Sequence, residues 1–107
     1  GADPRHDVVF VVEKWTRIYA GKQILAAHSP LFAELLYSSP SNEKEIELDR
    51  VNEREFLALL GVLYQTTRIN ESNVYFLLNL ARRFIIKLIV DLVEEFFISM
   101  TAYSRRR

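Results

Sequence analysis

The stretch KQILAAHSPLF, residues 22–32, decides the fold because it contains the end of one helix and the start of another. Its first half, residues 22–27, predicts a short helix that ends around His28. Ser29 and Pro30 then predict the start of a second helix, because a serine oxygen caps free N–H groups and proline fits the first helical turn. Two short helices in direct succession are therefore expected in the first third of the chain.

The segments around this pair predict a chain of the α+β class. Before it, the β-branched run at residues 8–12 and the extended residues 17–20 predict a hairpin. After it, the sequence EIELD at residues 45–49 alternates apolar and charged side chains, which predicts a strand with one solvated face. Further helices are expected from a cap at Asn52 through Tyr64, from a cap at Asn70 or Ser72 to about Arg83, and over residues 87–103.

The helix that follows Asn52 carries two additional signals. Glu55, three residues after Asn52, completes a capping box, and Val51 with Phe56 occupies the positions of a hydrophobic staple. Gly61, inside this helix, costs up to about 1 kcal/mol relative to alanine unless close packing offsets the loss.

The composition restricts the classes of function. The chain has 107 residues, 14 basic and 14 acidic side chains, a formal net charge of zero and no cysteine. Zero net charge gives no general attraction to nucleic acid or to an anionic membrane. The lack of cysteine excludes disulfides and thiol nucleophiles and fits a reducing compartment, so a cytoplasmic or nuclear location is expected. The apolar region at residues 85–100 contains too many charges for a membrane span.

No group of residues indicates catalysis. His28 has neither a nucleophile nor an orienting residue nearby, and His6, the only other histidine, lies in the N-terminal tail, so His28 is expected to be structural. Two histidines without cysteine do not suffice for a metal site, and the isolated glycines do not form a phosphate loop. Glu45, Glu47 and Asp49 alternate along a strand, which predicts a solvated face. We therefore expect no enzyme activity, metal, cofactor or small-molecule substrate.

Four blocks of the sequence follow one another as in a known family: DVVFVV, KQILAAHSPLF, EIELDRVNEREFLALLGVLY and NVYFLLNLARRFIIKLIVDLVEEFF. Over residues 7–100 the chain resembles a BTB/POZ domain, and it is similar to the BTB domains that accompany MATH domains, particularly those of nematodes. The resemblance implies a small mixed β-sheet flanked and capped by about five α-helices. It divides the chain into a tail at 1–6, the domain at 7–103 and a basic end at 104–107.

The resemblance implies homodimerisation and protein recruitment, often as the substrate adaptor of a cullin-RING ubiquitin ligase, with the substrate bound by another domain of the full protein. Many members exchange an N-terminal helix and strand across their dimer, and the six residues before Asp7 do not contain these elements. A monomeric linker similar to the elongin-type relatives of this fold is therefore one alternative. A transcriptional or architectural scaffold without cullin contact is another, and the short loop YSSPSNEKE favours it.

Two surfaces are predicted. In the first helical pair Leu25, Phe32 and Leu36 suffice for core contact, which leaves other apolar side chains for a self-complementary patch. The resemblance places Ile24 where the family buries an aliphatic side chain at the dimer centre. The predicted dimer interface consists of Ile24, Ala27, Leu31 and Leu35. The predicted partner surface, where a cullin would dock, consists of Tyr37, Pro40, Asn42, Glu43, Leu57 and Tyr64.

The last helix carries more apolar side chains than one core-facing stripe requires. One predicted stripe consists of Ile85, Ile89, Leu92, Phe96 and Met100, and a second consists of Ile86, Val90, Val93 and Phe97. The second stripe is expected to face either the core or a partner.

Overall fold

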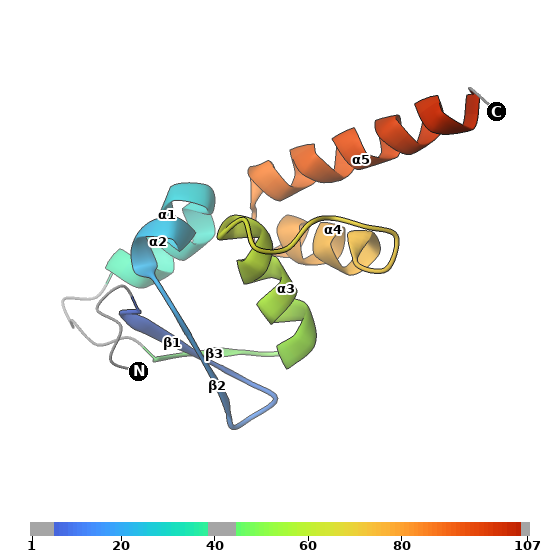
Figure 1. Ribbon diagram of the computed structural model, residues 1–107. Coiled ribbons are helices and arrows are strands. Elements are labelled where there is room, and N and C mark those ends of the chain that lie inside the picture. The colour runs from blue at the N-terminus through green and yellow to red at the C-terminus, as the bar shows by residue number, and fades with distance from the viewer. Residues whose placement is uncertain (1–5, 39–44, 106–107) are drawn as a thin grey trace.

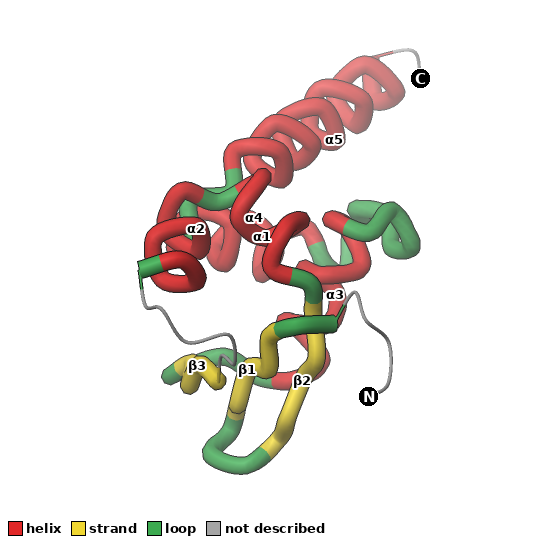
Figure 2. The backbone as a smooth tube through the Cα atoms, turned by 90° about the vertical axis from the view of Figure 1, so that its left-hand side faces the viewer, coloured by secondary structure: helices red, strands yellow, loops and turns green. Residues whose placement is uncertain are grey.

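The computed structural model describes residues 6–38 and 45–105. Figures 1 and 2 show a small sheet with the helices on one side of it and the last helix extending away from the rest. The strands are β1 (Val8–Val12), β2 (Thr16–Ala20) and β3 (Glu45–Leu48), and the helices are α1 (Lys22–His28), α2 (Pro30–Tyr37), α3 (Glu53–Leu63), α4 (Val74–Arg83) and α5 (Lys87–Arg105). The predicted α+β class and the order of the elements are confirmed.

The sheet has the strand order β2-β1-β3. The central strand β1 pairs antiparallel with β2 and parallel with β3, with Phe10 opposite Ile18 on one side and Ile46 on the other. All five residues of β1 are buried, whereas β3 alternates exposed Glu45 and Glu47 with half-buried apolar residues. The predicted solvated face of residues 45–49 is therefore confirmed, and the parallel pairing makes the sheet mixed.

Ser29 joins the two helices of the opening stretch to the end of α4. Its hydroxyl oxygen accepts a hydrogen bond from the backbone N–H of Phe32 at 3.0 Å, which caps α2 as predicted. The same hydroxyl donates to the backbone oxygen of Phe84, the residue that ends α4. Ser29 is only 1% exposed, and its side-chain hydroxyl makes hydrogen bonds to both α2 and the end of α4 inside the core.

Four phenylalanine rings from four parts of the chain form the centre of the core. Phe10 of β1 contacts Phe32 of α2 and Phe56 of α3, with ring centroids 5.5 and 5.0 Å apart. Phe84 closes the ring of contacts, at 5.0 Å from Phe32 and 6.3 Å from Phe56. Phe10, Phe32 and Phe56 are completely buried, and Phe84 is 4% exposed. This aromatic cluster holds the sheet against α2, α3 and α4.

The start of α3 confirms the predicted cap. The Asn52 side chain accepts from the backbone N–H of Glu55 at 2.7 Å, and both staple residues, Val51 and Phe56, are buried. A second cap was not visible in the sequence: the Glu13 carboxylate accepts from the backbone N–H of Glu53 at 2.6 Å. Glu13 lies in the turn between β1 and β2 and has a φ of 52°, so the hairpin tip contributes to α3.

Gly61 is packed closely against the segment that leaves α3. The backbone N–H groups of Thr66 and Thr67 both donate to the Gly61 carbonyl, at 2.8 and 3.1 Å. A Cβ added at Gly61 would lie 2.1 Å from the hydroxyl oxygen and 2.8 Å from the Cβ of Thr67. The close packing that could offset the cost of this glycine is therefore present.

The last two helices differ from the predictions in their details. Neither Asn70 nor Ser72 caps α4, because Asn70 instead accepts from the backbone N–H groups of Ser72 and Asn73 in the turn before the helix. From residue 85 through α5 the core-facing residues combine both predicted stripes: Ile86, Ile89 and Val93 are buried, whereas Ile85, Phe97 and Met100 are exposed. Ile85 has a φ of 57° and precedes the helix, so it does not belong to a stripe of α5. The helix also continues two residues beyond the predicted end at Tyr103.

Candidate functional site

The first helical pair presents apolar side chains to solvent beside its buried face. Leu25, Phe32 and Leu36 are buried, as predicted. Of the predicted interface, Ala27 and Leu35 are exposed, Leu35 to 45%, whereas Ile24 and Leu31 are half-buried and pack partly on the core. Ile24 and Ala27 are three residues apart on α1, and Leu31 and Leu35 are four apart on α2, so each pair shares a helix face. We call these four residues the α1–α2 patch.

A cavity adjoins this patch at the start of α1. It has a volume of about 520 Å³ and is lined by Asp7, Gly21, Lys22, Gln23, Ile24, Tyr37 and Tyr64. The structure thus brings Ile24, predicted for the dimer interface, next to Tyr37 and Tyr64, predicted for the partner surface. The two predicted surfaces are neighbours.

Hydrogen bonds from backbone N–H groups to side-chain oxygens position the residues around this cavity. The Tyr64 hydroxyl accepts from the backbone N–H of Gly21 at 2.9 Å, and the Asp7 carboxylate accepts from the backbone N–H of Lys22 at 2.7 Å. Tyr64 ends α3 as its C-cap rather than lying within the helix. Asp7 and Gly21 were not predicted as site residues, because a carboxylate and a glycine near a helix start have no sequence signal that links them to Tyr64.

Of the predicted partner residues, Tyr37 and Tyr64 line this cavity, and the others are separated from it or lie outside the described residues. Leu57 is 48% exposed on α3 and does not line the cavity, although Tyr64 follows it by seven residues. Tyr37, at the end of α2, is 58% exposed. Pro40, Asn42 and Glu43 lie outside the described residues.

The buried polar groups of the described residues serve structural roles. The buried polar side chains are Ser29 and Asn73, and each is hydrogen-bonded. His28 is the last residue of α1 and is half-buried. Across residues 6–38 and 45–105 there is no group of three histidine, cysteine or acidic residues that could hold a metal ion.

The resolved pKa shifts belong to two exposed cations, Lys87 and Arg17. The hydrogen bond from Lys87 to Asp91, at 2.7 Å along α5, raises the pKa of the Lys87 amine. Hydrogen bonds to Tyr19 and then to Glu45 raise the pKa of the Arg17 guanidinium. Both shifts favour charged forms that these side chains already adopt at neutral pH, so neither indicates a group adapted to proton transfer. None of the described helices is long and apolar enough to cross a bilayer.

A mixed three-stranded sheet lies under a cluster of helices, and the first helical pair exposes apolar side chains to solvent. The BTB/POZ domain family matches residues 3–101, and the chain belongs to this family. The family is one of protein-interaction domains and not of enzymes.

Similar curated proteins come from Caenorhabditis elegans. The chain is 40% identical over 95 residues to BTB and MATH domain-containing protein 36 and 33% identical over 95 residues to BTB and MATH domain-containing protein 38. These matches cover 86% of this chain but only 29% and 24% of the two relatives. The chain therefore corresponds to less than a third of each, and the predicted resemblance to MATH-accompanied BTB domains is confirmed.

Solved structures confirm the fold. The BTB domain of zebrafish PATZ1 matches with a TM-score of 0.71 and 20% identity, covering 88% of this chain and 76% of that one. The BTB domain of human gigaxonin matches with a TM-score of 0.72 and 24% identity, covering 88% and 79%. At these identities the likeness establishes the BTB architecture alone.

Proposed function

We propose that this domain forms a homodimer through the α1–α2 patch and acts as the dimerising arm of a substrate adaptor. The observation that supports this most is the patch itself, where Ala27 and Leu35 expose apolar surface on helices that bury Leu25, Phe32 and Leu36 in the core. A self-complementary apolar patch is what an isologous interface requires. Ile24 and Leu31 are anchored by their partial packing on the core, which lowers the entropic cost of ordering them in an interface.

The relatives suggest how a dimer would be used. Their names place a BTB and a MATH domain in one protein, and the chain spans only a minor part of each. In the proposed adaptor a further domain of the full protein binds the substrate, in the cytoplasm or the nucleus. Dimerisation then doubles the number of substrate-binding domains, which raises avidity through effective concentration without any new contact.

The substitution Ile24→Lys tests the dimer. Because an isologous interface contains Ile24 twice, two lysine side chains would lose their hydration in the same patch. A cost of about 2 kcal/mol at each copy corresponds to roughly a thousandfold weaker dimer. Light scattering across a dilution series measures the change, and an unaltered dimer mass would remove the interface assignment.

Two further variants separate loss of the interface from loss of the fold. Ile98→Lys makes the same chemical change at a side chain that is 68% exposed on α5, and it should leave the dimer intact. Ala27→Glu introduces a charge at an exposed position of the patch, where the folded monomer tolerates it, and it should dissociate the dimer while circular dichroism remains unchanged.

We further propose that the partner surface beside the patch docks a cullin scaffold. Tyr37 and Tyr64 present two aromatic rings at the same cavity, and partly exposed tyrosines are frequent anchors of protein interfaces. Titration calorimetry with a purified cullin N-terminal region should show binding that Tyr37→Ala weakens about thirtyfold, the equivalent of about 2 kcal/mol. Trp15→Ala is the control, because Trp15 is 79% exposed at the hairpin tip but belongs to neither predicted surface.

The alternative functions give different results in these experiments. A dimer that shows no heat with the cullin region would support the self-assembling scaffold. A monomer at all concentrations that still binds the cullin region would support the one-to-one linker.

A further inference from the structure

A second apolar surface lies along α5. A groove of about 480 Å³ separates α5 from the segment that follows α3, and a second hollow of about 320 Å³ lies between α5 and the start of α4. Phe96 lines both, so the two hollows meet at this ring. We call the pair of hollows the α5 groove.

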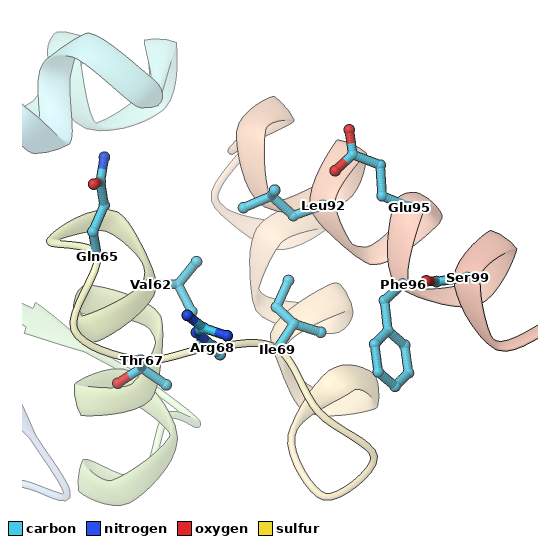
Figure 3. Close-up of a pocket in the computed structure, with 9 residues that line it drawn as sticks. All are labelled: Val62, Gln65, Thr67, Arg68, Ile69, Leu92, Glu95, Phe96 and Ser99. Carbon is cyan, nitrogen blue, oxygen red and sulfur yellow. The ribbon is translucent and has the colours of Figure 1, made fainter.

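The walls of the α5 groove are largely apolar. Figure 3 shows Val62, Ile69 and Leu92 pointing into the space between the end of α3 and α5, with Phe96 further along α5. Beyond Phe96 the apolar surface continues on Tyr75, which is 69% exposed and whose ring lies 5.9 Å from that of Phe97. Met100 and Tyr103, 38% and 61% exposed, extend it along the part of α5 that leaves the body of the domain. A continuous apolar surface of this kind indicates a docking site.

The charges at the rim of the α5 groove identify what fits it. Arg68 and Glu95 both line the first hollow, and Figure 3 places them on opposite sides of it. Both side chains are exposed, and within residues 6–38 and 45–105 neither takes part in an ion pair. One positive and one negative side chain therefore flank the same apolar surface and lack partners within the domain.

We propose that the α5 groove docks a second copy of this chain, related by a two-fold axis. In such a pair each contact between the two α5 grooves occurs twice. Arg68 of one copy faces Glu95 of the other, and Glu95 of the first copy faces Arg68 of the second. The apolar side chains around Phe96 come together at the centre, and the two ion pairs lie at the rim, where they set the register of the complex. Because the formal net charge of the chain is zero, no overall repulsion opposes the approach of the two copies.

This second face is independent of the dimer proposed above. The α1–α2 patch and the α5 groove share no residue, so a chain with both faces joins dimers into tetramers or longer assemblies. Each face can then be disabled separately, and the experiment starts from the Ala27→Glu variant, in which only the α5 groove remains.

Charge reversal in this background tests the proposal. Sedimentation velocity from millimolar to low micromolar concentration should show a monomer–dimer equilibrium for Ala27→Glu alone. Adding Arg68→Glu, or instead Glu95→Arg, turns both rim attractions into repulsions and should raise the dissociation constant at least about tenfold. Both positions are exposed, so the fold is expected to tolerate either change.

Mixing the two charge-reversed variants is the decisive step. In the mixed pair one copy carries two acidic rim residues and the other two basic ones, so both contacts are attractive again. The mixture should therefore form heterodimers with an affinity close to that of the parent, while each variant alone remains monomeric. An interaction of Arg68 and Glu95 within one chain would not produce this rescue.

The outcomes separate this proposal from the previous one. A strictly monomeric Ala27→Glu protein, or charge reversals without effect on the mass, would overturn docking of a second copy at the α5 groove. Rescue that fails on mixing would do the same and would assign the groove to a different occupant. Neither result bears on whether Ile24→Lys dissociates the dimer of the α1–α2 patch.

Discussion

Replacing Phe32 by alanine is expected to lower the free energy of unfolding by about 3–5 kcal/mol, the cost of removing a phenylalanine from a packed core. Phe32 is completely buried and its ring contacts both Phe10 and Phe84. The substitution therefore leaves a cavity at the point where the sheet meets α2 and the end of α4. Urea unfolding followed by circular dichroism, at one fixed protein concentration, should show a lower midpoint at an unchanged slope.

The matched control for this prediction is Trp15→Ala. Trp15 is an aromatic residue that is 79% exposed at the hairpin tip and lies outside the aromatic cluster. Its loss should change the free energy of unfolding by less than about 1 kcal/mol. Equal losses for the two variants would show that the aromatic cluster is not the centre of stability.

Replacing Gly61 by alanine should destabilise the domain by about 3 kcal/mol, the upper part of the range for overpacked sites. Helix propensity alone predicts the opposite, a gain of up to about 1 kcal/mol. Overpacking prevails because the new methyl group would lie 2.1 Å from the Thr67 hydroxyl oxygen, and two hydrogen bonds hold this segment to the Gly61 carbonyl. Calorimetric unfolding measures the sign of the change directly.

A second substitution isolates the cause of this effect. Thr67→Gly removes both atoms that the new methyl group would approach most closely, so the Gly61→Ala change should be much less harmful in that background. A double-mutant cycle should give a favourable coupling energy of about 1–3 kcal/mol between the two positions. Additive effects would mean that the cost of alanine arises elsewhere.

The elements of the fold could be predicted from local signals. Ser29 with Pro30 fixed the boundary between α1 and α2, and Asn52 fixed the start of α3, because caps act within a few residues of the positions they satisfy. The start of α4 was misplaced, since Asn70 uses its side chain to hold a turn instead of a helix end. The buried side of α5 was misjudged because it is decided by packing against α4, a contact between two segments that the periodicity of one helix does not show.

Contacts between distant segments could not be predicted. The hydrogen bond from Gly21 to Tyr64 joins two elements that show no mutual signal in the sequence, and it places a tyrosine beside the α1–α2 patch. Arg68 and Glu95 likewise appear as ordinary surface charges until the fold brings them to one groove. The apolar residues of the patch were proposed from side chains that the core did not need and from the family resemblance, and neither signal distinguishes exposed Leu35 from half-buried Ile24.

The cap that Glu13 supplies to α3 limits how the domain can be engineered. Exposed hairpin tips usually accept inserted peptides, and the neighbouring Trp15, at 79% exposure, makes this tip look suitable for an epitope tag or a fluorescent label. Glu13, however, reaches the backbone N–H of Glu53 only because the turn has its present length and its left-handed backbone. An insertion there would lengthen the turn and remove one of the two caps of α3, leaving only that of Asn52, so fusions and labels are better attached elsewhere.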